Sequence, residues 1–250
     1  MIRVSEIEAK SALTRSRIPS LDFCLNPYFG CGHGCRYCYA DFMCRFRKRK
    51  ERWGSFVDVK TNVPELLERQ LRRRPPGRVS ISTVTDPYQP VESKYRLTRR
   101  CLQTLLDYGR RISILTKSDL VLRDMDLLKQ FEACEVGLTI TTDNEKIKKL
   151  FEPNSPTIRR RIKALEKLKE QGIVTYAFIG PLLPANPAKL GEMIVPFADS
   201  LLVDRMNYRS KVVRIYRQNR LERFLEDDYF DAAAETFKKI FENKPVEVVW

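Results

Sequence analysis

The chain has 250 residues, of which 43% are apolar and 31% are charged. These proportions exclude a disordered polypeptide, a collagen-like rod and a small protein built on disulfides. Lysine and arginine number 46 against 32 acidic residues, which gives a formal net charge of +14. Such a surplus favours anionic partners, nucleic acid above all, although a soluble, thermophilic protein with solvated charged helix faces would also carry it.

The sequence indicates a cytoplasmic protein. Its apolar runs are shorter than the ~18–20 residues that a membrane span requires, and residues 1–10 are too charged for a signal peptide. The seven cysteines are an odd number. Because the cytosol keeps thiols reduced, we expect no disulfide framework.

Apolar, strand-like runs alternate with amphipathic helical patterns along most of the chain. In chain order the predicted elements are a strand at 21–26, a helix at 63–73, a strand at 78–83, a helix at 98–108, a strand at 112–116, a helix at 122–132, a strand at 135–141, a helix at 158–171, a strand at 173–179, a helix at 187–197 and a strand at 200–206. A charged, aromatic helical segment at 212–244 follows, which we expect to pack across the end of the sheet, and then a short strand at 246–249. This alternation is typical of βαβ units in a parallel sheet or barrel.

Six βα units are two fewer than a complete eight-stranded barrel contains. The predicted fold class is therefore α/β, a partial (β/α)6 TIM-type barrel with a C-terminal helical segment. We expect a single domain over residues 1–250, with its core at about 21–206 and a helical extension at about 212–250. An open barrel leaves a gap that could admit a large substrate, and its chemistry is expected at the C-terminal ends of the strands.

Three cysteines, Cys31, Cys35 and Cys38, follow the first predicted strand with the spacing C-x3-C-x2-C. Cysteine thiolates hold iron–sulfur clusters, normally four for each [4Fe–4S] cluster. Three ligands would leave one iron open, and an open coordination position is what a catalytic metal centre requires. The spacing therefore favours a catalytic cluster.

Zinc is the competing interpretation of this loop. The three cysteines could be joined by His33, Cys24 or Cys44. Structural zinc sites, however, usually combine a C-x2-C pair with a second, distant pair of ligands. His33 is the chain's single histidine and lies inside the loop, so no distant histidine pair exists.

The segment 25–40 carries a specific resemblance, in the residues L-N-P-Y-F-G-C-G-H-G-C-R-Y-C-Y-A. It resembles the radical S-adenosylmethionine (SAM) superfamily, and within it the spore photoproduct lyase-like branch, which is also described as DNA repair photolyase-related. Later segments that resemble the same branch are T-D-P-Y-Q-P-V-E at 85–92, L-T-R at 97–99, L-T-K-S at 115–118 and L-R-D-M-D-L-L at 122–128. The resemblance runs in order from about Cys24 to Pro184.

The resemblance implies a radical SAM enzyme with lyase-like chemistry. A reduced [4Fe–4S] cluster would bind SAM at its open iron and cleave it to a 5′-deoxyadenosyl radical, which abstracts hydrogen from a substrate, while the protein supplies binding and orientation. Cys31, Cys35 and Cys38 would be the cluster ligands. The electron would come from a donor such as ferredoxin or flavodoxin.

The resemblance also implies SAM-binding roles for residues at the strand ends. Tyr37, the aromatic residue before the last ligand, would lie beside the adenine. Thr85 and Asp86 would bind the methionine amine, and Lys117 would pair with the carboxylate, a role that suits a flexible ammonium group. The remaining expected contacts are those of Thr139 and Thr141 with the ribose and those of Gly180 and Pro181 with the adenine.

One position departs from the pattern of the lyase. Spore photoproduct lyase has a hydrogen-donating cysteine where this chain has Thr83. A hydroxyl is a poor hydrogen-atom donor compared with a thiol, which argues against thymine-dimer reversal by the same route. Tyr39, directly after the last ligand, matches a tyrosine of the lyase's radical relay and is the candidate catalytic residue.

The substrate class stays open among nucleic acid, a peptide and a small metabolite. A basic and aromatic segment at 45–53 suggests nucleic acid, because its cations could bind phosphates while a ring stacks on a base. Residues 204–209 are a second candidate for substrate contact. The alternative function is a basic nucleic-acid-binding protein whose cysteine loop holds zinc or a structural iron–sulfur cluster and performs no radical chemistry.

Overall fold

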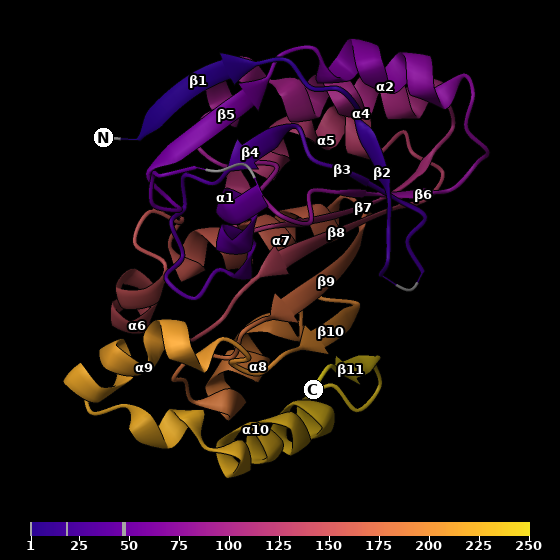
Figure 1. Ribbon diagram of the computed structural model, residues 1–250. Coiled ribbons are helices and arrows are strands. Elements are labelled where there is room, and N and C mark those ends of the chain that lie inside the picture. Colours follow the sequence, from indigo (N-terminus) through magenta and orange to yellow (C-terminus); the bar gives the residue numbers. More distant parts are fainter. Residues whose placement is uncertain (1, 19, 47–48) are drawn as a thin grey trace.

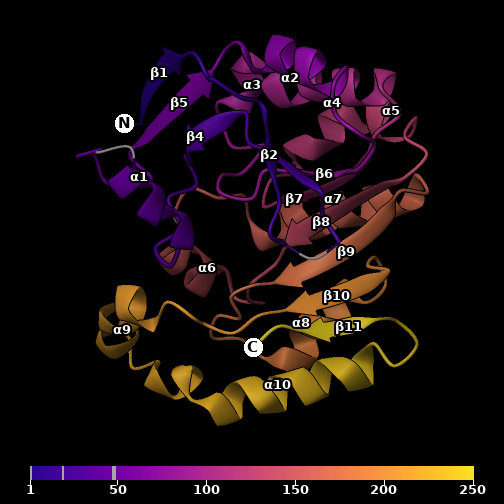
Figure 2. The same cartoon turned by 45° about the vertical axis from the view of Figure 1, so that its right-hand side comes forward.

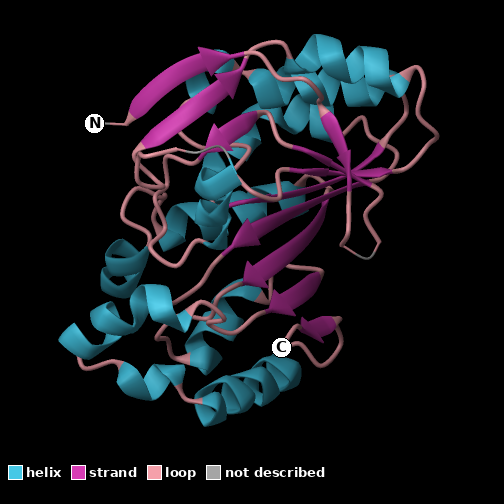
Figure 3. Ribbon diagram, viewed as in Figure 1, coloured by secondary structure: helices cyan, strands magenta, loops and turns pink. Residues whose placement is uncertain are grey.

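The computed structural model describes residues 2–18, 20–46 and 49–250. Its main feature is an eight-stranded sheet with the order β11-β10-β9-β8-β7-β6-β3-β2 (Figures 1 and 3). The strands are β2 (Leu13–Arg15), β3 (Phe23–Leu25), β6 (Arg78–Ile81), β7 (Arg111–Thr116), β8 (Cys134–Thr139), β9 (Val174–Ile179), β10 (Ser200–Val203) and β11 (Val246–Val248). Neighbouring strands are parallel, except that β2 pairs antiparallel with β3 at one edge.

Helices connect the parallel strands and cover the sheet. The longer ones are α2 (Val63–Leu71), α4 (Leu97–Asp107), α7 (Ile158–Glu170) and α8 (Pro187–Ile194). Short helical segments are η1 (Tyr39–Phe42), α1 (Met43–Phe46), α3 (Glu92–Tyr95), η2 (Asp119–Asp124), α5 (Met125–Leu128) and α6 (Glu145–Phe151). Within the described ranges, no helix combines the length and the apolarity needed to cross a membrane.

The two faces of the sheet have different surroundings. In β7, Ile112 and Ile114 are buried in the hydrophobic core, whereas Ser113 and Leu115 alternate with them and line a cavity on the opposite face. This follows from the two-residue period of a strand, which sends successive side chains to opposite faces. One face of the sheet therefore packs against helices, and the other is left for a ligand.

The predicted α/β fold with an open parallel sheet is confirmed. Each of the six core strands occurs where the apolar runs predict it, and the strand order ends at β2 and β11 without closing into a ring. The predicted helix at 122–132 is wrong in its form, because the structure has the 3₁₀ segment η2 followed by the short α5. Asp124 lies at their junction, where its buried carboxylate accepts hydrogen bonds from Arg99 and Arg123.

A second, smaller sheet was not predicted. Its order is β1-β5-β4, with β1 at Arg3–Ile7, β5 at Phe56–Lys60 and β4 at Tyr28–Gly30. The two outer strands are difficult to predict from the sequence. Most residues of β1 are exposed and two of the five are charged, and β4 has only three residues. The small sheet lies beside the N-terminal half of the large one (Figure 1).

The C-terminal segment is helical, as predicted. It comprises α9 (Arg209–Gln218), η3 (Glu222–Leu225) and α10 (Asp227–Ile240), which lie beyond β10 and β11, away from the small sheet (Figures 1 and 2). The apolar stripe of α10, with Phe230, Ala233 and Phe237, is buried, and this helix packs against α8. Lys211 of α9 reaches the cysteine loop, where its Nζ donates a hydrogen bond to the carbonyl oxygen of Cys38 at 2.8 Å.

Candidate functional site

A cavity of about 410 Å³ lies at the C-terminal ends of strands β6 to β10. Cys31, Cys35 and Cys38 all line it. Of the other residues predicted from the sequence, those in the lining are Tyr37, Tyr39, Thr83, Thr85, Asp86, Lys117, Thr139, Gly180 and Pro181. The segment 204–208 completes the wall, so residues distant in the sequence meet around one space.

The three loop cysteines are free thiols, as are the other four cysteines of the chain. Burial raises the pKa of all three thiols, and for Cys35 it brings the value to about 12. Mutual repulsion between the sulfurs contributes in the same direction for Cys31 and Cys35. Without a bound cation these side chains are neutral thiols, and a metal centre would displace their protons.

Backbone packing fixes the shape of the loop. Gly34, between the first two cysteines, lies directly against Gly54, and a Cβ atom on Gly54 would stand 2.7 Å from the Cα atom of Gly34. Gly54 also has φ +91°, a region that other residues rarely adopt. The turn that contains Gly54 therefore holds the cysteine loop in place.

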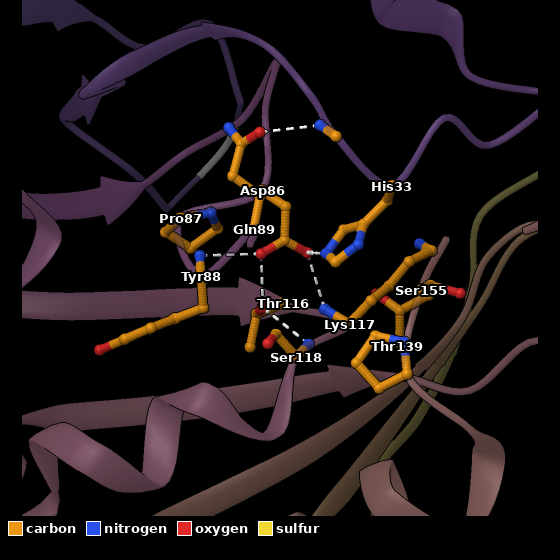
Figure 4. A network of polar contacts seen from close by, with 12 residues as sticks. His33, Asp86, Pro87, Tyr88, Gln89, Thr116, Lys117, Ser118, Thr139 and Ser155 are labelled. Atoms are coloured by element: carbon orange, nitrogen blue, oxygen red, sulfur yellow. Dashed lines mark hydrogen bonds and ion pairs between the residues drawn. The ribbon is translucent and has the colours of Figure 1, made fainter. Parts of the chain in front are cut away.

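Asp86 connects the cysteine loop to the sheet (Figure 4). Its Oδ1 accepts hydrogen bonds from Thr116 Oγ1 at 2.6 Å and from the amide of Tyr88 at 2.9 Å. Its Oδ2 accepts one from the amide of Lys117 at 2.8 Å and lies 3.3 Å from Nε2 of His33. Burial works to raise the pKa of Asp86, but the His33 ring, Thr116 and Lys117 outweigh it and hold the pKa at about 2.

Thr85, like Asp86, forms hydrogen bonds that anchor the cysteine loop. Its hydroxyl donates a hydrogen bond to the carbonyl oxygen of Gly30 at 2.6 Å and accepts one from Nε2 of Gln89 at 2.9 Å. Thr85 and Asp86 both line the cavity while they also anchor the loop. Their role in binding the methionine amine stays a prediction, to which the structure adds the role of loop anchors.

A second carboxylate, Glu152, lies fully buried behind the loop. It forms an ion pair with Arg161 and accepts hydrogen bonds from the hydroxyl groups of Tyr37 and Thr141, while Nζ of Lys117 stands 3.8 Å from its Oε1. Burial works to raise the pKa of Glu152, but the charges of Arg161 and Lys117 and these hydrogen bonds bring it to about 2. The network fixes Tyr37 and directs the Lys117 ammonium toward the cavity wall.

Thr139, the last residue of β8, and Thr141, two residues later, occupy different positions. Thr139 lines the cavity, as its predicted role requires. Thr141 is outside the lining, and its hydroxyl donates a hydrogen bond to Oε1 of Glu152 at 3.1 Å. The contact of Thr141 with a ribose is therefore the least supported of the predicted contacts.

Four exposed aromatic rings extend outward from the cavity wall. Tyr39 stacks between Tyr208 and Phe42, with ring centroids 6.1 Å and 6.3 Å away, and Phe46 meets Phe42 edge-on at 5.8 Å. In the described part of the chain, no other aromatic side chain is comparably exposed. We call these four rings the aromatic ladder. The hydroxyl of Tyr39 donates a hydrogen bond to the carbonyl oxygen of Thr83.

Comparison with known families identifies this site. The family model described as the radical SAM superfamily matches residues 25–194, which include the cysteine loop and the strand ends around the cavity. The chain belongs to the radical SAM superfamily. Members of this superfamily use a [4Fe–4S] cluster and SAM.

Individual relatives of this radical SAM protein differ in what is known of them. An uncharacterised protein of Methanocaldococcus jannaschii is 45% identical over 183 residues, which cover 73% of this chain and 69% of that protein. A protein of Pseudomonas phage M6 named radical SAM Nα-GlyT isomerase is 26% identical over 160 residues, 63% of this chain and 32% of the isomerase. The fold is similar to that of spore photoproduct lyase in complex with a dinucleoside spore photoproduct, with a TM-score of 0.66. The two sequences are 13% identical, and the alignment covers 98% of this chain and 82% of the lyase chain.

The residues around the cavity fit the cofactors of the superfamily. Three thiols face one space, and the cavity wall also holds buried polar groups of three residues without a hydrogen-bond partner in the described part of the chain: the Ser82 hydroxyl, the Trp53 indole N–H and the ring nitrogens of His33. Buried polar groups are normally paired, so a bound polar group would be a natural partner for them. Among residues 2–18, 20–46 and 49–250, no three histidine, cysteine or acidic side chains are grouped to hold one metal ion.

Sequence reasoning missed two residues of this radical SAM site, Glu152 and Arg161. In the helix predicted at 158–171, Arg161 is fully buried, whereas the neighbouring Ile162 is only partly buried. The burial of Arg161 could have been predicted from its position, because it shares one helix face with Ile158, Leu165 and Leu168. A charged residue on a buried stripe indicates a buried partner.

Replacing Gly54 with alanine should destabilise the protein and disturb the cysteine loop. The new methyl group would meet the Gly34 backbone, so the two segments must move apart. Gly172→Ala is the matched control, because Gly172 has φ +75° but nothing within 4 Å of the added Cβ. We expect the control to lose about 1–2 kcal/mol of unfolding free energy and the Gly54 variant to lose more, together with iron content. Equal losses in denaturant titrations, with equal iron, would contradict the packing role of Gly54.

Proposed function

We propose that the chain is a radical SAM enzyme in which Cys31, Cys35 and Cys38 hold the [4Fe–4S] cluster. The observation that carries this proposal is the convergence of three free thiols on one cavity at the strand ends. With both cofactors bound and one electron supplied, the site would provide a 5′-deoxyadenosyl radical for hydrogen abstraction. An acidic electron carrier such as ferredoxin or flavodoxin would suit the +14 charge of this chain, and we propose a cytoplasmic setting.

The chain's own residues would bind and orient SAM. Lys117 supplies a partly shielded ammonium, with 14% of its side chain exposed, that could pair with a carboxylate. Ser82 supplies an unpaired hydroxyl at the end of β6. Thr139 would face the ribose, and Gly180 and Pro181 would flank the adenine together with the buried ring of Tyr37.

Asp86 and Glu152 would keep this arrangement rigid. Asp86 ties His33 of the cysteine loop to the end of β7, and Glu152 fixes Tyr37. Both carboxylates are held in the ionised form at neutral pH by these contacts. The contacts would keep the cysteine loop and Tyr37 in place around the bound cofactors.

We further propose nucleic acid as the substrate class. The support comes from the net charge, from the aromatic ladder at the cavity wall, and from cations beside it, such as Lys211, whose Nζ lies 5.3 Å from the centroid of the Tyr208 ring. Aromatic rings next to basic groups bind unpaired bases by stacking. Of the basic segment predicted at 45–53, Arg47 and Lys48 lie outside the described residues.

Binding of a single-stranded oligonucleotide should therefore weaken steeply with salt. We expect the logarithm of the affinity to fall linearly with the logarithm of the salt concentration, with a slope near −0.7 for each contacted phosphate. Tyr208→Ala should weaken binding by about 5- to 150-fold, because one stacked base contributes ~1–3 kcal/mol. Val174→Ala, an exposed apolar position outside the cavity lining, is the control. Salt-independent binding, or equal affinities of both variants in fluorescence anisotropy, would remove nucleic acid as the substrate class.

The reaction itself is tested by label transfer. The reduced enzyme would be incubated anaerobically with SAM and oligonucleotides deuterated at the sugar or at the base methyl groups. Deuterium in 5′-deoxyadenosine would identify the hydrogen that is abstracted. Formation of unlabelled 5′-deoxyadenosine with every nucleic acid, followed by labelling with a peptide or a small metabolite, would move the proposal to that substrate class.

A further inference from the structure

Trp53 lies in the turn that packs against the cysteine loop, and its ring lines the same cavity as the three cysteines. Two aromatic neighbours hold the ring edge-on: Phe29, with a centroid distance of 6.2 Å and an interplanar angle of 85°, and Phe56, at 6.1 Å and 88°. The orientation of the indole is therefore set by packing against these two rings.

The indole N–H of Trp53 is buried and has no hydrogen-bond partner among the described residues. Trp53 shares the cavity wall with Cys31, Cys35 and Cys38. Buried donors are normally paired, and an indole nitrogen can only donate, so an acceptor bound in the cavity between the three sulfurs would satisfy it.

Backbone contacts hold the turn that contains Trp53 against the cysteine loop. Gly54, the next residue, is in direct backbone contact with Gly34. The turn is also tied to strand β1, because the amide of Arg3 donates a hydrogen bond to the carbonyl oxygen of Ser55 at 2.9 Å. The backbone of this turn is therefore held against the cysteine loop at Gly34 and against β1 at Arg3.

We infer that the Trp53 indole N–H donates a hydrogen bond to a sulfur of the cluster and thereby raises the reduction potential of the cluster. The inference rests on the proposed function in one respect, that the three cysteines hold a [4Fe–4S] cluster. Reduction adds one electron, and the sulfurs carry part of the added negative charge. A donor aimed at a sulfur stabilises the reduced form more than the oxidised form. Trp53 is a positioning residue in this account, since it acts through the cluster.

The test is Trp53→Phe, which keeps an aromatic ring against Phe29 and Phe56 and removes the N–H. The anaerobically reconstituted variant would be titrated with dithionite, and the reduced cluster would be followed by EPR. We expect unchanged iron content and a reduction equilibrium about threefold to tenfold less favourable, the size of one net hydrogen bond. At 59 mV for each factor of ten, the midpoint potential should fall by about 30–59 mV. Trp250→Phe, at the other tryptophan, should leave the potential unchanged.

A Trp53→Phe protein with full iron content and an unchanged potential would overturn the inference and leave the proposed function intact. Absence of iron from the wild-type protein would instead defeat the proposed function. The reduction potential can be measured only on protein that contains the cluster. A variant that assembles little cluster therefore needs a second measurement. In the Trp250→Phe background Trp53 is the single tryptophan, and its fluorescence should be quenched when the cluster is assembled. Unchanged fluorescence on loading would also overturn the inference.

Discussion

Replacing Cys35 with alanine should lower the iron content of the anaerobically purified protein from about four atoms per chain to nearly none. The reason is geometric, because Cys35 is one of three thiols on the cavity, and two thiolates cannot hold a four-iron cluster against competing solvent and thiols. The measurement is iron and sulfide analysis together with the visible absorption of the cluster. Activity, measured as 5′-deoxyadenosine formed under reducing conditions, should be lost in parallel.

Cys44→Ala is the matched control for this experiment. Cys44 is close in sequence and half-buried, but it is not among the residues that line the cavity. Its variant should keep the iron and the activity of the wild type. Iron retained by the Cys35 variant would contradict the assignment, as would equal loss in both variants, which would point to Cys44 as a fourth ligand.

Replacing Glu152 with glutamine should lower the free energy of unfolding by about 3–5 kcal/mol, the range observed when one partner of a buried ion pair is removed. Arg161 is fully buried, so its guanidinium would keep its charge without a counter-charge. Chemical denaturation at neutral pH would measure the loss. The double variant Glu152→Gln/Arg161→Met removes the unpaired charge, and it should be less destabilised than the two single variants predict together.

The same carboxylate predicts how stability depends on pH. The pKa of Glu152 in the folded protein is about 2, below its ordinary value of 4.5, so the folded state favours the ionised form. Its contribution is complete above the ordinary value and is lost as the pH falls from about 5 toward 2. Asp86, with a pKa of about 2 against 3.8, contributes over nearly the same range. Glu152→Gln should therefore flatten the acid limb of the stability curve, whereas Glu192→Gln, at an exposed position of α8, should leave it unchanged. An equally steep limb in the Glu152 variant would contradict this assignment.

The large sheet was predictable because parallel strands are buried on both faces and appear as apolar runs. The runs at 112–116 and 135–141, for example, match β7 and β8. The cysteine loop was predictable because its spacing is local. The strand β1 was not predictable, since it is mostly exposed and charged and pairs with β5, about fifty residues later.

The two carboxylate networks show where sequence reasoning fails. Asp86 was predicted as a ligand contact, but its anchoring role depends on His33 and Thr116, which approach it only in the folded chain. Glu152 was not predicted at all, because the hydroxyl it binds belongs to Tyr37, 115 residues earlier. Such networks depend on tertiary contacts and leave no periodic pattern in the sequence.

The most direct test of the cysteine-held cluster is the EPR spectrum of the reduced wild-type protein before and after addition of SAM. A cluster held by three cysteines has an iron that SAM can bind, so the spectrum of the reduced cluster should change when SAM is added. A colourless protein with one bound zinc would contradict this account of the site. A cluster signal that SAM leaves unchanged would also contradict it, because every iron would then already be fully ligated.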